Sequence, residues 1–521
     1  AHPNVEGMYR LLQDNSVRHL YCSGLCASAA SLFSSVLIQR VECPFVFILG
    51  DLEEAGYFYH DLTQILGTEQ VLFFPSSFRR AIKYGQKDAA NEILRTEVLS
   101  RLQKGEEGLC VVTYPDALAE KVVSRKELGD KTLKLHLGEK VDMDFVTEVL
   151  RSYSFEYVDY VYEPGQYAVR GSIIDVFSFS SEFPFRIDFF GDEVESIRTF
   201  EVESQLSKEK KENIVIVPDL SHSLEQRGNG GMVSFLDFLQ PDTLLAMKDF
   251  LWLRERIQTV HDEALTAQAI AAREAEENGL ISLDGKLIDG GEFTLRALDF
   301  RRIEFGTKPT GTPDATVTFN TTAQPIFHKN FDLVAESFHD YLSRNYALYI
   351  CSDSLKQTER IRAIFEDRGD NISFTSVERT LHEGFADDAL RLCIFTDHQL
   401  FDRFHKYNLK SDKARSGKVA LSLKELNQFT PGDYVVHTDH GVGRFTGLVR
   451  IPNGDTTQEV MRLVYQNDDV VFVSIHSLHK VSKYKGKEGE APRLNKLGTG
   501  AWEKLKDRTK TKIKDIARDL I

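Results

Sequence analysis

The segment 163–200 constrains the fold most, because it combines turn residues, strand patterns and paired charges more densely than any other part of the chain. Its sequence is EPGQYAVRGSIIDVFSFSSEFPFRIDFFGDEVESIRTF. Turns are predicted at Pro164-Gly165, at 180–182 and at Gly191-Asp192. The stretches between these turns are therefore expected to form short antiparallel strands joined by hairpins.

Alternation of side chains divides the run 185–190 between two faces of a strand. One face is apolar and is predicted to lie in the core: Phe185, Ile187 and Phe189. The other face mixes charges with an aromatic ring: Arg186, Asp188 and Phe190. An arginine and a phenylalanine on a rigid strand are the kind of anchor that protein interfaces favour. A solvated face with one incidental phenylalanine is the alternative interpretation.

Residues 1–122 alternate strand and helix patterns, which predicts an α/β layer. The loop after the first expected strand, SGLCASAAS at 23–31, lies where a phosphate-binding loop would lie. It has no second glycine followed by lysine and Ser or Thr, and that lysine is the residue that would reach the β- and γ-phosphates. We therefore expect the loop to open a helix and not to hold a nucleotide. Strands are expected at 18–22, 44–50, 70–75 and 109–114, and helices at 53–66 and 89–102.

Two predictions concern the borders of the strand-rich insert, 123–210. A helix is expected over 144–153, where the apolar residues Phe145, Val149 and Leu150 recur at helical spacing. The lysine-rich SKEKKEN at 207–213 is expected to be a solvated loop.

The α/β pattern resumes over 211–325, with strands expected at 213–217, 243–247 and 315–319 and a long helix over 251–277. Lys248-Asp249 follows the second of these strands. A lone carboxylate beside a lysine is a poor site for the Mg²⁺ that ATP chemistry needs. Because the segments on either side of the insert have the pattern of two halves of one fold, we predict a single domain that is split in sequence.

The segment 326–425 repeats a compact α/β pattern. Helices are expected over 332–344 and 355–367, and strands over 347–351, 372–375 and 390–396. Asp397-His398 follows the last strand without a recognisable nucleophile, so a loop cap is the favoured interpretation of this pair. Residues 406–424 have the composition of a basic linker.

A different pattern begins at Phe429, where FTPGDYVVHTDHGVGRFTGLVRI is followed by EVMRLVYQNDDVVFVSIHSLHKVSKY. Four or five short strands separated by turns predict a small β-barrel. His437 and His440 have a ligand-like spacing, but without a nearby Cys or third His no metal site is expected. Beyond it, Trp502 and Leu505 start an amphipathic helix that is expected to run, without a stop signal, to the last residue.

Length, net charge, hydropathy and cysteine content limit the classes of protein to which this chain can belong. The 521 residues exceed what one hydrophobic core usually holds, so several domains are expected. With 64 basic and 79 acidic residues the net charge is −15, which disfavours strong unaided binding of the whole chain to nucleic acid. We find neither a membrane-spanning pattern nor a signal peptide, so a cytoplasmic protein without membrane contact is expected. Six cysteines, predicted to be reduced and mostly buried, are scattered along the chain: Cys22, Cys26, Cys43, Cys110, Cys351 and Cys393.

The chain resembles the transcription-repair coupling factor family over essentially its whole length. RGSIIDVF and FRIDFFGDEVESI resemble the insert that this family shares with the repair protein UvrB, and PGDYVVHTDHGVGRF resembles its RNA-polymerase-interacting domain, which is also similar to CarD regulators. The resemblance implies a multidomain α/β and α+β fold. Its parts are a UvrB-like domain with a degenerate P-loop (1–122 and 211–325), the insert (123–210), a small α/β domain (326–425), an SH3/Tudor-like β-barrel (428–490) and a truncated linker helix (491–521).

The resemblance also implies an adaptor function, in which the chain binds stalled RNA polymerase through its β subunit and recruits UvrA for nucleotide excision repair. It places the UvrA contact at Arg170, Arg186 and Phe190. It places the polymerase contact at Arg444, Val449, Arg450 and Ile451. No catalytic residue, metal or cofactor is expected in this chain, because the family's ATP-dependent, helicase-type translocase motor, which makes most of the DNA contact, follows the linker helix.

Two alternatives differ in class. A UvrB-type ATP-dependent damage-recognition protein would need the missing phosphate-binding lysine and an acidic pair at 248–249. A CarD-like transcription regulator with an unrelated amino-terminal part would not carry the insert.

Overall fold

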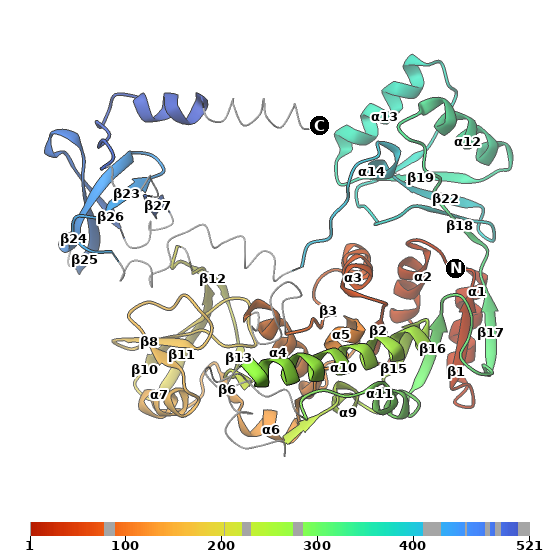
Figure 1. Cartoon of the computed structure of the whole chain (residues 1–521), viewed down its shortest axis with the longest axis horizontal. Helices are drawn as coiled ribbons and strands as arrows, with labels where there is room; N and C mark the ends of the chain where they lie inside the picture. The colour runs from red at the N-terminus through yellow and green to blue at the C-terminus, as the bar shows by residue number, and fades with distance from the viewer. Residues whose placement is uncertain are drawn as a thin grey trace. The chain divides into compact units, whose positions relative to one another are not determined.

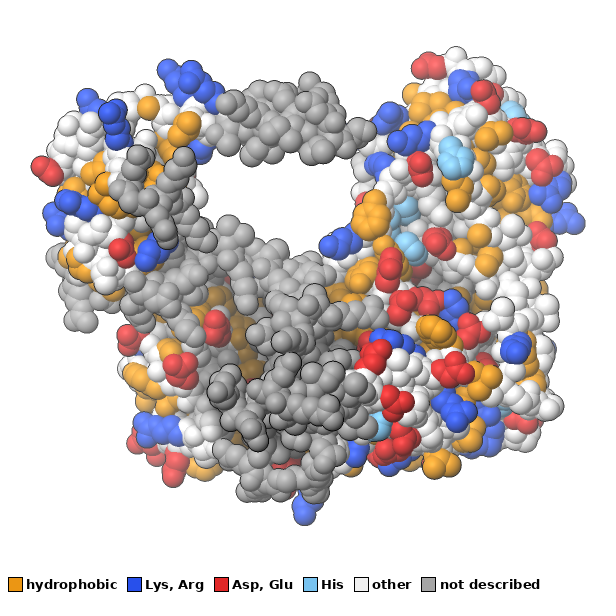
Figure 2. Space-filling view, viewed as in Figure 1, with side chains coloured by type: hydrophobic (Ala, Val, Ile, Leu, Met, Phe, Trp, Pro, Cys, Tyr) orange, Lys and Arg blue, Asp and Glu red, His pale blue; other side chains and the backbone are white. Residues whose placement is uncertain are grey.

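The computed structural model describes residues 2–77, 89–202, 204–220, 231–274, 285–409, 429–453, 456–474, 480–484 and 491–508 (Figure 1). The chain divides into two compact units, the first formed by Ala1–Lys131 with Leu220–Lys413 and the second by Thr132–Asp219 with Ala414–Ile521. On the face shown in Figure 2, acidic and basic side chains are interspersed over the described surface. No described helix is long and apolar enough to cross a membrane.

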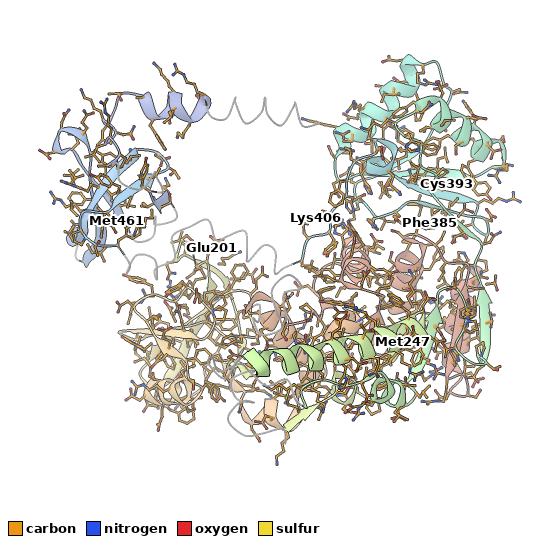
Figure 3. All side chains as sticks on the ribbon, in the orientation of Figure 1. Glu201, Met247, Phe385, Cys393, Lys406 and Met461 are labelled. Atoms are coloured by element: carbon orange, nitrogen blue, oxygen red, sulfur yellow. The ribbon has the colours of Figure 1, made fainter. Side chains whose placement is uncertain are left out.

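The first unit is built on a parallel sheet of seven strands in the order β17-β1-β16-β15-β2-β4-β3. Strands from both sides of the insert therefore pair within one sheet. Met247, labelled in Figure 3, is fully buried in β15. The bounds are β1 (His19–Ser23), β2 (Phe45–Ile48), β3 (Val71–Phe73), β4 (Cys110–Thr113), β15 (Leu244–Lys248), β16 (Arg301–Phe305) and β17 (Ala315–Thr318).

Helices and a short two-stranded pair, β5 (Val122–Val123) with β14 (Met232–Val233), complete this domain. The helix α3 begins where the Asp51 carboxylate accepts a hydrogen bond from the amide of Glu54, and it ends at Gly67, whose φ of 83° suits glycine. The helices are α1 (Pro3–Gln13), α2 (Ala29–Ile38), α3 (Leu52–Leu66), α4 (Ala89–Lys104), α5 (Pro115–Leu118), α6 (Arg125–Asp130), α9 (Phe235–Phe238), α10 (Phe250–Glu274) and α11 (Gly290–Ala297).

The first unit also contains a small α/β subdomain, formed by the described residues 321–409. Its five strands follow the order β18-β21-β22-β19-β20, with parallel pairing around β19 and antiparallel pairing around β21. Phe338, Phe365 and Phe395 lie in its core. Its elements are β18 (Thr321–Ala323), α12 (Phe331–Ser343), β19 (Ala347–Cys351), α13 (Leu355–Asp367), β20 (Thr375–Val377), β21 (Phe385–Asp387), β22 (Leu392–Thr396) and α14 (Asp397–Leu400).

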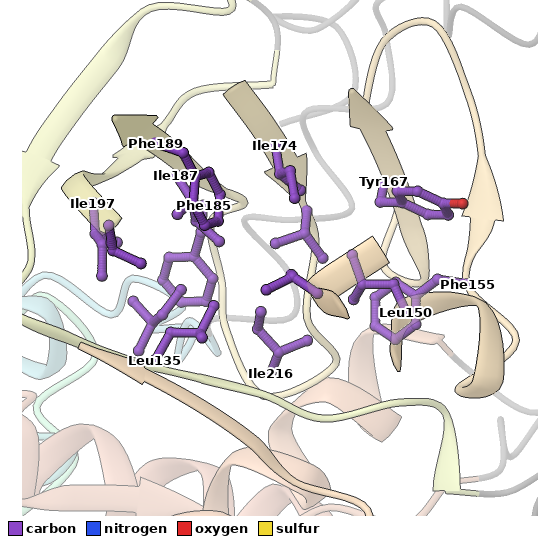
Figure 4. Close-up of a cluster of buried hydrophobic side chains, with 14 residues drawn as sticks. Leu135, Leu150, Phe155, Tyr167, Ile174, Phe185, Ile187, Phe189, Ile197 and Ile216 are labelled. Carbon is purple, nitrogen blue, oxygen red and sulfur yellow. The ribbon is translucent and has the colours of Figure 1, made fainter. Parts of the chain in front are cut away.

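The insert forms a six-stranded sheet in the order β12-β11-β10-β9-β8-β7, one face of which packs on helix α7 (Met143–Ser152). Figure 4 shows the apolar side chains of this core, among them Phe185, Ile187 and Phe189, as the alternation predicted. The strands are β7 (Glu156–Tyr157), β8 (Gln166–Arg170), β9 (Ile173–Val176), β10 (Phe185–Phe190), β11 (Glu193–Phe200) and β12 (Ser207–Lys210). A separate pair joins β6 (Leu133–His136) to β13 (Asn213–Ile216).

Three expectations about the insert and the segment that follows it were wrong in detail. Phe145 is 52% exposed, because α7 buries Val146 and Leu150 and turns Phe145 away from the sheet. The first part of SKEKKEN is not a loop but the exposed edge strand β12, which pairs with β11. The strand at 213–217 does not join the parallel sheet, since β13 pairs antiparallel with β6.

The carboxy-terminal sheet contains five antiparallel strands in the order β26-β25-β24-β23-β27. Val435, Phe445 and Leu463 lie in its core. The expected basic linker beyond residue 409 and the expected helix beyond residue 508 lie outside the described residues. The strands are β23 (Tyr434–His437), β24 (Gly441–Asn453), β25 (Thr456–Val464), β26 (Val470–Ser474) and β27 (Val481–Lys483).

Candidate docking surfaces

Arg170 and Arg186 meet at one buried carboxylate on the face of the insert sheet that lies opposite α7. Asp175 of β9 is fully buried, and Arg186 of β10 binds it with two hydrogen bonds, Nε to Oδ1 at 2.8 Å and Nη2 to Oδ2 at 2.9 Å. Arg170 of β8 donates to the same Oδ2. The Arg186 side chain is 15% exposed and its guanidinium also lies 4.5 Å from the Phe200 ring centre. Both arginines are therefore held by their own chain, but Arg186 is mostly enclosed, whereas the Arg170 side chain is 38% exposed.

Phe190 occupies the tip of the same hairpin. It ends β10 directly before the Gly191-Asp192 turn, and 78% of its surface is exposed. Asp188, two residues earlier on the same face, accepts a hydrogen bond from Ser172 and lies 4.0 Å from Arg198. The face that the sequence predicted is thus a fixed polar array with one projecting aromatic ring.

The strand β24 is long and unevenly paired. β25 pairs with it from Arg444 to Asn453, but in the described part of the chain β23 pairs with it only over 441–444. A bulge lies between Phe445 and Gly447, where Gly447 has a φ of 128°. The bulge breaks the alternation of side chains and shifts the faces of the residues beyond it.

The four predicted polymerase-contact residues all lie on β24. Arg444 is exposed, whereas Val449 and Ile451 are half-buried. Arg450 belongs to the strand, but its side chain lies outside the described residues. Phe445, in contrast, is buried in the core of the sheet. The described edge of β24 beyond the bulge therefore carries partly accessible apolar side chains.

The position of the degenerate nucleotide loop is occupied by the chain itself. A side chain at Gly24 would clash with the carbonyl oxygen of Phe319, and the amide of Cys26 donates to Thr321 Oγ1 at 3.1 Å. At the end of β15, Lys248 pairs with Glu54, and Asp249 accepts a 2.9 Å hydrogen bond from the amide of Thr307. We find neither a lysine at the loop nor a free pair of carboxylates among the described residues near it.

The histidine pairs of the sequence have structural contacts. His437 and His440 stack with ring centres 4.6 Å apart. Asp397 pairs with Arg403, and the His398 ring contacts the carbonyl of His382. Asp397 and His398 therefore hold neighbouring chain segments in place, but they lie in the short helix α14 and not in a loop. In the residues that the structure describes, no group of three or more His, Cys, Asp or Glu could hold a metal ion.

Comparisons with known proteins agree with this arrangement. The family model of the UvrB interaction domain matches residues 133–222, and that of the CarD-like/TRCF RID domain matches residues 429–485. A transcription-repair-coupling factor of Bacillus subtilis (strain 168) is 24% identical, over 96% of this chain and 48% of that protein. This chain is a relative of the transcription-repair-coupling factors. One from Staphylococcus aureus (strain bovine RF122 / ET3-1) has the same identity and the same shares.

The chain spans about half the length of the curated coupling factors that it matches, and it corresponds to their amino-terminal portion. The two matched domains are the insert with its flanking β6–β13 pair and the carboxy-terminal sheet. The candidate residues of both docking surfaces fall inside these matches.

Sequence reasoning missed Asp175, which holds both arginines. The signal was present, because an aspartate inside the apolar run IIDVF had to find a cation, and Arg186 is its direct partner in the pairing of β9 with β10.

Proposed function

We propose that this chain is the adaptor part of a transcription-repair-coupling factor, which docks UvrA through its insert and the β subunit of RNA polymerase through its carboxy-terminal sheet. It thereby links a stalled polymerase to nucleotide excision repair. The observation that carries the proposal is the presence, in one chain, of a UvrB interaction domain and a CarD-like/TRCF RID domain.

The geometry of the insert supports the first contact. A protruding aromatic ring beside fixed charges gives a partner an apolar anchor together with orientation. Because Arg186 is mostly enclosed, the more exposed Phe190 and Arg170 are the residues that a partner reaches most directly.

The geometry of β24 supports the second contact. A strand that lacks a pairing partner along one side can add a strand of another protein, with main-chain hydrogen bonds for affinity and alternate side chains for specificity. Val449, Arg450 and Ile451 lie on that part of β24.

The chain itself is proposed to have no ATPase activity. Where UvrB-type proteins would bind a nucleotide, the Cys26 amide of its loop and its two candidate residues, Lys248 and Asp249, already have partners within the chain. DNA translocation and most DNA contact would belong to the part of the coupling factors that this chain does not match.

A ternary-complex experiment tests the proposal. The whole chain is mixed with purified UvrA and core RNA polymerase, and the mixture is separated by size-exclusion chromatography. We expect UvrA and polymerase to elute together only when the chain is present. Binding of one partner that excludes the other would contradict an adaptor, and binding of neither would refute both docking surfaces.

A further inference from the structure

A loop of the small α/β subdomain is inserted against the parallel-sheet domain of the same unit. We call residues 380–384 the latch loop. The amide of Ser28, at the amino end of α2, donates to the carbonyl of Glu383 at 3.3 Å, and the amide of Glu383 donates to Ser28 Oγ at 3.0 Å. The amide of His382 donates to the buried carboxylate of Asp61 on α3 at 2.7 Å. Three hydrogen bonds thus tie the latch loop to α2 and α3.

The latch loop occupies a chemically meaningful place. In a nucleotide-binding α/β domain, the amides at the amino end of the helix after the first strand hold phosphate. Here that place is taken by the carbonyl of Glu383, and the Asp61 carboxylate next to it also accepts a hydrogen bond from Ser31 at 2.8 Å. The degenerate loop has therefore become the socket for another part of the chain.

Four histidines and one tyrosine line this contact. On α3, Tyr57 stacks on His382 with ring centres 3.4 Å apart, and His60 lies 5.1 Å from His405. His405 also stacks on His398 at 4.3 Å. Figure 2 shows pale-blue histidine atoms beside orange hydrophobic atoms on the part of the surface that carries α14 and the chain after it. Rings of α3 thus contact rings of the small subdomain, by stacking between Tyr57 and His382 and edge-on between His60 and His405.

We propose that the latch loop and these four histidines form a proton-sensitive latch, which holds the small subdomain on α2 and α3 when the rings are neutral and releases it when they are protonated. His60 of α3 and His405 of the small subdomain face each other across the contact with ring centres 5.1 Å apart, so positive charges on both rings repel each other. A released ring is surrounded by water, which solvates its positive charge.

The pKa values set the direction of the response. Burial lowers the pKa of His382 and of His398 to about 4, and burial also lowers the pKa of His60 and of His405. A released histidine takes up a proton near pH 6.5, whereas a docked one stays neutral, so acidification below pH 6.5 favours release. This loss of docking free energy accumulates as the pH falls from 6.5 towards 4.

Asp61 acts in the opposite sense. Burial raises its pKa to about 6, so that the docked carboxyl takes up a proton before a released one does, and docking gains free energy as the pH falls below 6. One carboxyl acts against four imidazoles. The net effect of acidification is therefore release.

Other charges surround the cluster without neutralising it. Asp353 and Asp397 favour protonation of His405, yet burial outweighs both. Asp397 is paired with Arg403, and the half-exposed Glu383 lies 3.7 Å from the His382 ring. Burial, and then the charges of Glu53 at the start of α3 and of Glu383, raise the pKa of Tyr57.

Amide hydrogen exchange of the whole chain between pH 7.5 and 4.5, corrected for the intrinsic pH dependence of exchange, tests the latch. We expect the amides of the latch loop and of α3 to exchange at least about tenfold faster below pH 6, while strands β2, β4, β19 and β22 keep their protection. Latch amides that stay protected to pH 4.5, or that lose protection together with those four strands, would overturn the proposal.

Charge substitution at pH 7.5 gives a second measurement. His398→Lys places a permanent charge in the cluster and should open the latch, whereas His398→Gln should leave it closed. The matched control is His339→Lys on the exposed surface of α12 in the same subdomain, which should change nothing. Equal exchange in all three variants would also overturn the proposal. If His398→Lys unfolds β19 and β22, the wild-type titration decides.

Discussion

Asp175 determines what the two arginines of the insert can do. A fully buried carboxylate that accepts hydrogen bonds from Arg186 and Arg170 fixes both guanidinium groups on one face of the sheet. It also means that substitution of Arg186 would change stability and docking together. The single residues of this face therefore need separate tests.

Replacement of Asp175 by Asn should destabilise the insert. The change leaves Arg186 largely buried without its counter-charge, and such a loss typically costs about 3 kcal/mol of unfolding free energy. Asp188→Asn is the matched control. Asp188 is partly exposed and its carboxylate lies as far as 4.0 Å from the Arg198 guanidinium, so loss of this charge should cost less than about 1 kcal/mol. Urea unfolding of both variants measures the difference. Equal unfolding free energies of the two variants would show that Asp175 does not stabilise this face of the insert sheet.

Phe190→Ala should leave stability unchanged and weaken UvrA binding. The ring makes little contact with its own chain, and an aromatic anchor at the centre of an interface is typically worth about 2 kcal/mol or more. Leu206→Ala, at another exposed apolar residue of the insert, should not change the affinity. Surface plasmon resonance with immobilised UvrA makes the comparison. If Phe190→Ala binds like the parent chain, the alternative of an incidental phenylalanine is correct.

For single residues, the sequence predicted the face of a strand on which a side chain lies better than it predicted the residues that the side chain contacts. Alternation assigned Phe189 to the core and Phe190 to the surface correctly, because the period of a strand is fixed by its backbone. It misplaced Phe145, since a helix with apolar residues at neighbouring positions can present more than one stripe, and only the packed sheet decides which stripe is buried.

At the scale of the element, β24 combines a core half and an accessible half in one strand. Before the bulge it is paired on both sides, and beyond it the described pairing is to β25. The same strand thus contributes Phe445 to the sheet core and Ile451 to a partly exposed position.

Ile451→Arg should abolish polymerase binding while the melting temperature stays within a few degrees of the parent value. A half-buried position near the end of the strand can direct a charged side chain into water. Phe445→Arg is the contrasting variant, because a charge in the core should unfold the sheet. Thermal melts and co-elution with core polymerase separate the two cases. Retained binding by a folded Ile451→Arg chain would remove β24 from the interface.

The central strand β16 shows why an element can escape prediction. Its sequence RRIEF has too many charges for a strand between two others, and none was expected there. Two of its three charged side chains have specific partners: Arg301 donates to the carbonyl of Val17, and the buried Glu304 lies 2.8 Å from His19 and accepts from Thr310. These partners are distant in sequence, so local propensity could not reveal them.

At the scale of the whole molecule, the chain is expected to bind no ATP. The Cys26 and Ser28 amides of the degenerate loop are engaged by Thr321 and Glu383, and Lys248 is paired with Glu54. Titration calorimetry with ATP and Mg²⁺ should therefore give no heat of binding at micromolar to millimolar nucleotide. A micromolar dissociation constant would instead support the UvrB-type alternative.

The overall organisation was more accessible from sequence than the contacts between its parts. Turn residues and periodicity located most strands and helices, and the motifs indicated the family. The histidine cluster could not be found in this way, because its members come from four separate places in the sequence and meet only when the small subdomain packs on α3.

The strand order of the parallel sheet has a consequence for synthesis on the ribosome. β1 lies between β17 and β16, and β2 lies between β15 and β4, so His19 pairs with Arg302 and the first strand has no neighbour until residues 301–318 have emerged. The six insert strands of the described structure form a sheet of their own and are complete much earlier. During translation the insert can therefore fold on its own while the apolar strand β1 is still unpaired. Unpaired apolar segments of a nascent chain are of the kind that chaperones protect.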